Sequence, residues 1–473
     1  EMAAWWLATL LAILAQEAAA EKYTADWASL DARPLPAWYD NAKFGIFCHW
    51  GVYSVPAFHS EWFWWYWQGA NPDKQFVDFV NERYAPGTTY ADFARDFRAE
   101  RFNATQFAGV VKESGAKYFV LTSKHHEGFT MWPSPTAWQW NAVEVGPKRD
   151  IVGELKKAFA TTGVEFGLYF SLFEWFHPYF KSNVSKYVEQ VSYPQLLEIV
   201  SKYEPSVIWS DGDWDVTDDV WKSRDFLAWL YNDSPIKDKV VVNDRWGKDC
   251  LGKHGGFLTY SDHYDPGTLL PRKWENCMTL DEHSWGHRKD MTATDVHDVH
   301  SLIEQLARTV SCGGNFLLNV GPDQHGRIPP LFEDRLRDLG AFLKVNDVAL
   351  YGTVAAPVQN DTANTWYTRR KDADGTTLYA WVLDTSADVL QFDKIRAGAN
   401  TKVFIVALPN EKVWWKADED GKININLTSI PWRRLPRSDS IVFGVQAPAK
   451  MSSRERLAAA AEWKINIGEW VPK

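Results

Sequence analysis

The stretch Ser206–Trp214 combines residue types that suit sugar chemistry. It opens with a short β-branched and aromatic run, which predicts a strand, and Asp211-Gly212 is a turn signal that places a carboxylate at the carboxyl end of that strand. Parallel α/β folds keep their chemistry at this end of their strands. Trp209 and Trp214 flank the carboxylate, and an indole face packs well against the apolar face of a pyranose ring. Two interpretations remain open: Asp211 serves a carbohydrate site, or it merely begins a turn beside core tryptophans.

Polar and aromatic residues also follow other apolar runs of the chain. One such residue in a loop is usually solvated or structural, but several at successive strand ends predict a shared site, because these ends converge on one mouth in a barrel. The residues in question are His49, Glu61, Trp62, His125, His126, Tyr169, Trp209, Asp211 and Arg245.

Other chemistries lack their sequence signals. No H-E-x-x-H run or compact His/carboxylate spacing indicates a metal, and His125 and His126 should point different ways if their strand continues. The glycines 313–314 lead into a predicted strand rather than a helix, so they predict no phosphate loop. No Gly-x-Ser-x-Gly elbow is present. We therefore expect neither metal nor cofactor.

The elements that must position these residues alternate between strand and helix over some 300 residues. This alternation favours a (β/α)8-type barrel over residues 21–352, with a doubly wound open sheet as the competitor. Strands are predicted at Lys43–Trp50, Lys117–Thr122, Phe166–Ser171, Ser206–Trp209, Val240–Asn243, Gly256–Tyr260 and Asn315–Val320. Helices are predicted at Ala104–Gly115, Ile151–Phe159, about Leu196–Tyr203, Val220–Tyr231, Ala293–Val310 and Leu331–Leu343.

Beyond Gly352 the pattern changes to short alternating strands with turn signals at Asp374-Gly375 and Asp420-Gly421. We predict a C-terminal antiparallel β-sandwich over residues 353–450, followed by a tail at 451–473 for which the sequence indicates no role. The predicted strands are Trp366–Arg369, Thr377–Leu383, Lys402–Leu408, Lys422–Leu427 and Ser440–Phe443.

Composition narrows the class of ligand. The chain has 473 residues, enough for two domains, and a formal net charge of -10 without a basic tract, which argues against nucleic acid. Its 27 tryptophans are far above ordinary usage and favour carbohydrate.

The chain carries signals of the secretory pathway. Residues 1–20 contain an apolar core and end in an alanine-rich cleavage signal, which predicts a signal peptide, and no later stretch is apolar enough to span a membrane. A Cys250–Cys277 disulfide is one arrangement that the cysteines allow. Sequons for N-glycosylation stand at Asn103, Asn183, Asn232, Asn360 and Asn426.

From about Trp38 to the C-terminal region, the chain resembles the α-L-fucosidases of glycoside hydrolase family 29, close to the animal lysosomal type. The motifs that carry the resemblance are Ala42–Gly51, Ser60–Trp62, Lys124–Phe129, Trp209–Gly212, Asn243–Trp246, Lys273–Cys277 and Gly313–Pro322.

The resemblance implies a retaining exo-hydrolase that removes terminal α-linked L-fucose from glycoproteins, glycolipids and oligosaccharides, in the lysosome or outside the cell. Asp211 is expected to be the nucleophile, and Trp62 to lie against the C5-methyl face of the sugar. The implied partners are fucosylated glycans, with a homo-oligomer left open. A non-catalytic, lectin-like fucose-binding homologue is the alternative function. The residues expected to hold the fucose are His49, Glu61, His125, His126, Tyr169, Trp209 and Arg245.

The sequence leaves the acid/base residue undecided between Glu275 and Asp262. Glu275 stands in the tight motif Lys273-Trp274-Glu275, where an aromatic neighbour can desolvate it, whereas Asp262 follows a predicted strand. Either carboxylate can instead be structural, with Glu275 held by Lys273 or Arg272. Glu61 is the third candidate if both fail.

Overall fold

A computed structural model describes residues 22–362, 364–372 and 375–449. The predicted signal peptide and the tail at 451–473 lie outside these residues. Within the described ranges, no helix combines the length and apolar character that crossing a bilayer requires.

The N-terminal part is built on a curled sheet of seven strands, all parallel, in the order β5-β4-β3-β2-β1-β7-β6. Nearly every residue of these strands is buried, as expected for parallel strands that are covered on both faces. The strands are β1 (Phe44–Cys48), β2 (Tyr118–Lys124), β3 (Glu165–Ser171), β4 (Val207–Asp211), β5 (Val241–Val242), β6 (Glu275–Thr279) and β7 (Asn315–Val320).

An irregular segment closes the gap between the two edge strands. Phe257 N donates to Val242 O of β5 at 3.1 Å, while Leu258 N donates to Lys273 O and Glu275 N donates to Leu258 O, both at 2.9 Å. The predicted strand at 256–260 is reduced to a single bridge between Leu258 and Trp274, and it cannot extend past Tyr260, whose backbone is left-handed with φ of +58°. The segment takes the eighth place in the ring, which confirms the barrel-type fold and disfavours the open sheet.

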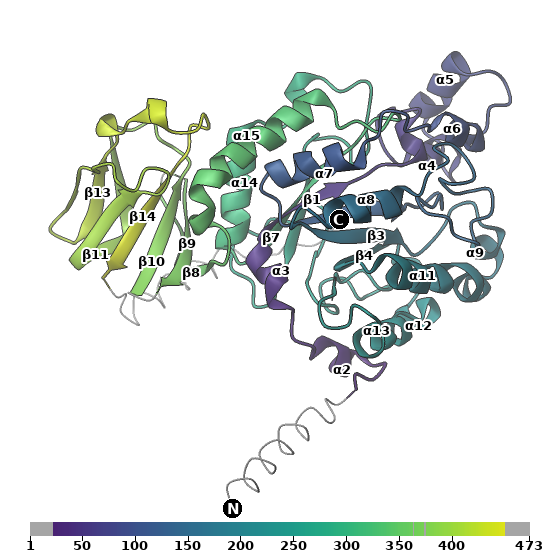
Figure 1. Ribbon diagram of the computed structural model, residues 1–473, viewed down its shortest axis with the longest axis horizontal. Coiled ribbons are helices and arrows are strands. Elements are labelled where there is room, and N and C mark those ends of the chain that lie inside the picture. Colours follow the sequence, from purple (N-terminus) through teal and green to yellow (C-terminus); the bar gives the residue numbers. More distant parts are fainter. Residues whose placement is uncertain (1–21, 363, 373–374, 450–473) are drawn as a thin grey trace, which may run out of the picture.

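Helices cover the outside of the barrel (Figure 1). In α8, for example, Ile151, Leu155 and Phe159 form one buried face, and Asp150 caps the helix by accepting from Gly153 N at 2.9 Å. The predicted helix at 293–310 begins only at Val299, after a short turn. The main helices are α7 (Ala104–Glu113), α8 (Ile151–Phe159), α11 (Tyr193–Tyr203), α13 (Ser223–Asn232), α14 (Val299–Ser311) and α15 (Pro330–Asn346).

The C-terminal strands form a separate antiparallel unit that packs on α14, away from the barrel mouth (Figure 1). The long strand β11 changes register twice and pairs with β13 on one side and β14 on the other, so that it links two sheets around one apolar core. This confirms the predicted sandwich. The strands are β8 (Val354–Asp361), β9 (Thr365–Asp372), β10 (Gly375–Val382), β11 (Val389–Ile405), β12 (Trp415–Ala417), β13 (Lys422–Asn426) and β14 (Ile441–Pro448).

The suggested Cys250–Cys277 disulfide is wrong, since both thiols are free and buried. Cys277 lies on β6 and packs inside the barrel with Phe47 and Trp209, whereas Cys250 packs in the core outside the strands. The two side chains therefore belong to different apolar clusters.

Candidate active site

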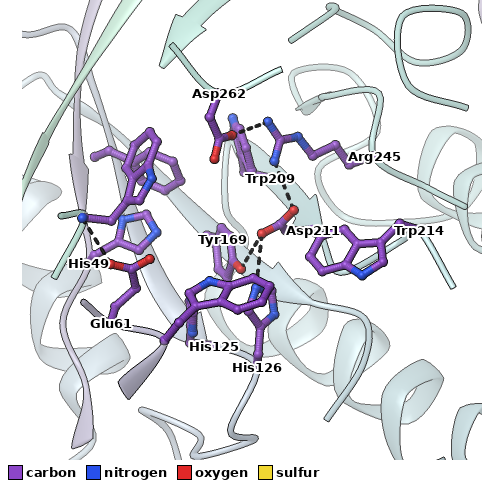
Figure 2. A pocket seen from close by; sticks show the side chains of 13 residues that line it. His49, Glu61, His125, His126, Tyr169, Trp209, Asp211, Trp214, Arg245 and Asp262 are labelled. Atoms are coloured by element: carbon purple, nitrogen blue, oxygen red, sulfur yellow. Dashed lines mark hydrogen bonds and ion pairs between the residues drawn. The ribbon is translucent and has the colours of Figure 1, made fainter. Parts of the chain in front are cut away.

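A small cavity opens at the carboxyl ends of the barrel strands (Figure 2). Its volume of about 180 Å³ lies below the range of roughly 300–1,000 Å³ usual for larger ligands, and it suits one monosaccharide. The structure brings together Asp211, Asp262 and all eight residues predicted to bind substrate. The lining residues are Phe47, His49, Glu61, Trp62, His125, His126, Tyr169, Trp209, Asp211, Trp214, Arg245, Asp262 and Trp285.

Asp211 is the last residue of β4, and the chain turns at once through Gly212, whose φ is +72°. The carboxylate is only 8% exposed. Its Oδ2 accepts from Tyr169 OH at 2.8 Å and its Oδ1 accepts from Arg245 Nη1 at 3.1 Å, while His126 Nε2 lies 3.6 Å from Oδ2. These contacts fix the carboxylate at the cavity wall.

Arg245 links Asp211 to a second carboxylate. Its Nη2 donates to Asp262 Oδ1 at 2.5 Å, and its Nε donates to Thr259 at 3.1 Å, so three donors of one planar guanidinium are used. The side chain of Asp262 remains 50% exposed at the cavity mouth. Desolvation raises the pKa of Asp262, but the positive charge of Arg245 outweighs it and holds the pKa below its usual value.

His49 and His126 are neutral hydrogen-bonding groups of the cavity. Burial and the nearby His125 ring lower the pKa of His49 to about 3, and its Nδ1 lies 2.8 Å from Asn319 Oδ1. Burial likewise lowers the pKa of His126, whose Nδ1 bonds Ser171 Oγ at 2.8 Å. His125 and His126 were expected to point different ways only if their strand continued, but β2 ends at Lys124, and both rings line the same cavity with centroids 4.1 Å apart.

Glu61 and Trp62 reach the cavity from the loop that follows β1. Glu61 Oε2 accepts from Ser284 Oγ at 3.2 Å and from the backbone N–H groups of Trp285 and Gly286 at 3.1 and 3.3 Å. These donors satisfy one oxygen and orient the carboxylate. The Trp62 ring lies nearly parallel to Trp214, with centroids 6.1 Å apart and an interplanar angle of 20°.

Glu275 does not line the cavity. It is the first residue of β6, and its side chain is fully buried inside the barrel. Tyr39 OH and Tyr118 OH donate to Oε2 at 2.6 Å each, and Trp209 Nε1 donates to Oε1 at 2.9 Å. Lys273 instead bonds Asp40 and Gly313, so it does not hold Glu275 as expected.

Several residues in or beside the cavity were not singled out from the sequence. Phe47 and Trp285 line the cavity, although neither stands at a polar strand end. Asp213 is buried two residues after Asp211, and burial together with the charge of Asp211 raises its pKa to about 7. The run Asp211-Gly212-Asp213 was the only available signal for this additional carboxyl group. Among the residues that the structure describes, no group of three His, Cys, Asp or Glu side chains has metal-binding geometry.

A barrel that gathers two linked carboxylates, tryptophans and neutral histidines around a monosaccharide-sized cavity defines a glycoside hydrolase. Comparison with known proteins gives the family. The statistical model of the family described as alpha-L-fucosidase matches residues 10–348. The chain therefore belongs to the α-L-fucosidase family.

Individual relatives agree with this assignment. The chain is 57% identical to a putative alpha-L-fucosidase of Caenorhabditis elegans, over 90% of this chain and 93% of that protein. It is 54% identical to a plasma alpha-L-fucosidase of Rattus norvegicus, over 77% and 81% of the two chains. The fold matches the crystal structure of Thermotoga maritima alpha-fucosidase in complex with fucose, with a TM-score of 0.75 and 30% identity over 90% of this chain and all 100% of that one.

Proposed function

We propose that this protein removes single terminal α-linked L-fucose residues from glycoproteins, glycolipids and oligosaccharides, with net retention of configuration. The protein is a fucose-hydrolysing glycosidase by its family. The observation that carries the mechanism is the Arg245 guanidinium, which holds Asp211 and Asp262 at one cavity through two different nitrogens. The small volume of the cavity supports the removal of one terminal sugar at a time.

Asp211 is the nucleophile of this mechanism. Its carboxylate attacks the anomeric carbon, and the bond to the leaving oxygen breaks as Asp262 gives that oxygen a proton. In the second step Asp262 takes a proton from water, the hydroxyl oxygen forms a bond to the anomeric carbon, and Asp211 leaves as a carboxylate. Two displacements with inversion give net retention.

Asp262 is the better acid/base among the three candidates. It is half exposed at the mouth, where a leaving saccharide must exit, whereas Glu275 is enclosed by three donors inside the barrel. Glu61 lines the cavity, but three donors already hold one of its oxygens, which suits an acceptor for sugar hydroxyls. Because Arg245 lowers the pKa of Asp262, we expect the proton to be present mainly at acid pH or once substrate disrupts this ion pair.

The remaining residues hold the fucose and take no part in proton transfer. Neutral His49 and His126, together with Glu61, offer donors and acceptors to the hydroxyl groups, and Trp62 offers an apolar face to the C5-methyl side. Burial and the negative charge of Asp211 raise the pKa of Tyr169, so its hydroxyl stays protonated and keeps donating to Asp211. No step of this mechanism needs a metal or a cofactor.

Hydrolysis of 4-nitrophenyl α-L-fucoside, followed by proton NMR during the first turnovers, tests the proposal. We expect α-L-fucose to appear first and to equilibrate later with the β anomer. First appearance of the β anomer contradicts the retaining mechanism. Binding of fucose without release of nitrophenol supports the lectin-like alternative, and faster hydrolysis of 4-nitrophenyl α-galactoside contradicts the choice of sugar.

We further propose that the protein acts in the lysosome or outside the cell. The predicted signal peptide, the five sequons and a relative from plasma support this location. Asn232 is the sequon least suited to a glycan, since its Nδ2 donates to Tyr23 O and to Ala228 O, both at 2.8 Å. Mass spectrometry of the secreted protein tests both points, with glycan expected at sites other than Asn232.

A further inference from the structure

Two further hollows continue outward from the active-site cavity. Trp62 and Trp214 line both that cavity and the first hollow, whose volume is about 540 Å³. Trp64 and Gln68 line both the first hollow and the second, whose volume is about 630 Å³. The active-site cavity therefore adjoins the first hollow, and the first hollow adjoins the second. We call the two outer hollows together the tryptophan trough.

Helix α4 (Phe63–Gln68) and the loop after β3 supply the aromatic wall of the trough. Trp175 is buried and forms a base on which other rings pack: its centroid lies 5.8 Å from Trp65 and 5.5 Å from Trp64, with interplanar angles of 27° and 30°. These rings are partly exposed above it. A rigid aromatic surface of this kind needs no rearrangement before a flat ligand stacks on it.

The far end of the trough exposes an indole to solvent. Trp138 lines the second hollow and is 74% exposed. A tryptophan this exposed beside other aromatic residues marks an interaction surface rather than a core. Helices α4 and α9 (Pro178–Ser182) lie on the side of the barrel away from the C-terminal sheets, so these sheets do not cover the trough (Figure 1).

Polar groups alternate with the rings. Gln68 is exposed where the two hollows meet, and its Oε1 accepts from Trp64 Nε1 at 3.2 Å. Lys181 and Asp215 are exposed on the first hollow and carry opposite charges, so this hollow has no dominant sign of charge. A surface of apolar faces with hydrogen-bonding edges fits neutral sugar rings. An acyl chain would use only the apolar faces, and a charged polymer would use only the polar edges.

We propose that the trough binds the oligosaccharide that carries the fucose, as a row of leaving-group subsites beyond the bond that is cleaved. The proposal rests on the proposed function, because continuity with the active-site cavity is what orients the glycan. Its ligand is a neutral saccharide chain that leaves the cavity past the Trp62 and Trp214 pair and runs over α4 toward Trp138. The enzyme should then prefer fucose on a chain of several sugars to fucose on a small aglycone.

The test measures kcat/KM for three substrates: 4-nitrophenyl α-L-fucoside, a fucosyl disaccharide, and an oligosaccharide of about five neutral sugars with the same terminal fucosyl linkage. We expect kcat/KM in the natural protein to rise from the disaccharide to the longer oligosaccharide. In Trp138→Ala it should fall about five- to tenfold for the longer substrate, through KM, and change less than about twofold for the other two, since one aromatic contact is lost. Gln68→Ala should show the same pattern more weakly.

Trp414→Ala is the matched control, because Trp414 is 56% exposed on the C-terminal unit, away from the trough. Equal losses on all substrates, or no dependence on chain length, overturn the trough proposal. A fucosylated glycolipid in micelles is measured as a fourth substrate, and a loss confined to it shows a lipid occupant and also overturns the proposal. If no fucoside is cleaved, the proposed function fails instead, and NMR titration of Trp138→Ala and natural protein with the fucose-free oligosaccharide still decides whether the trough binds sugar.

Discussion

The carboxylates at the cavity differ from the carboxylate inside the barrel in their access to a ligand. Asp211 and Asp262 both bond Arg245, and both side chains line the cavity that a ligand enters. Glu275 lies within the barrel, where two tyrosine hydroxyls and one indole N–H surround it. The same functional group is thus available for chemistry in one place and fully used as a structural acceptor in the other.

Strand direction explains the difference. Asp211 is the last residue of β4, whereas Glu275 is the first residue of β6, and the strands are parallel. Their side chains are therefore held at different levels of the barrel, with the Trp209 ring bonded to Glu275 while it also lines the cavity. Access, rather than burial of the acid alone, separates a reacting carboxylate from a structural one.

Removing the nucleophile should have the largest effect. Asp211→Asn should lower kcat by at least about three orders of magnitude, because the covalent route is lost. The side chain keeps its size, so thermal unfolding should shift by only a few degrees, and circular dichroism serves as the folding control. Turnover within about tenfold of the natural protein contradicts the assignment.

Loss of the acid should depend on the leaving group. Asp262→Ala should lower kcat/KM by about two to four orders of magnitude for a fucosylated oligosaccharide and much less for 4-nitrophenyl α-L-fucoside, whose leaving oxygen needs little protonation. Added azide should then yield α-L-fucosyl azide, since it attacks the fucosyl-enzyme in the second displacement. Glu61→Ala is the comparison variant, and rescue in that variant alone moves the acid role to Glu61.

Glu275 should behave in the opposite way to Asp262. Glu275→Ala leaves three buried donors without their acceptor, at about 1–3 kcal/mol each, so unfolding by denaturant should show several kcal/mol of destabilisation. Turnover per folded active site should stay within about tenfold, and azide should not affect it. Glu275→Gln retains an acceptor and should be less destabilised. Well-folded protein with a thousandfold loss of activity, rescued by azide, would restore Glu275 as the acid.

The smallest effect is expected at His49. His49→Ala should lower kcat/KM about tenfold through a lost contact with a sugar hydroxyl. Because its pKa is about 3, the imidazole gains its proton only as the pH falls through about 3, so it contributes no limb between about pH 4 and pH 8. Both limbs of the pH–rate profile should therefore persist in the variant, and loss of either one contradicts a purely binding role.

Much of the barrel could be predicted from sequence because most of its strands are apolar runs that end in polar residues, whereas β6 is not apolar and was not identified. That pattern placed Asp211, His125 and Arg245 at one mouth of the barrel, because the carboxyl ends of parallel strands meet there. The sandwich was predictable from alternating residues and turn signals, although β8 and the short β12 were not identified. The division of the chain at residue 352 and the tail stay predictions.

The rest depends on contacts between distant parts of the chain. The donors that enclose Glu275 come from Tyr39, Tyr118 and Trp209, and no local pattern relates them to the Lys273-Trp274-Glu275 motif. The aromatic residue of this motif correctly indicated that Glu275 is desolvated. The motif did not indicate that Glu275 begins a strand and lies inside the barrel, away from the cavity. Trp285 and the tryptophan trough depend on loop conformations, which hydrophobic periodicity does not determine.

Covalent trapping tests the central claim most directly. The natural protein is incubated with a fluorinated fucosyl inactivator, which slows breakdown of the intermediate, and the digested protein is mapped by mass spectrometry. We predict one fucosyl label per chain on the peptide with Ser206–Trp214, with fragment ions placing it on Asp211, and no label on Asp211→Asn. A label on Asp213, Asp262 or Glu61, or inactivation without any covalent label, would contradict the account.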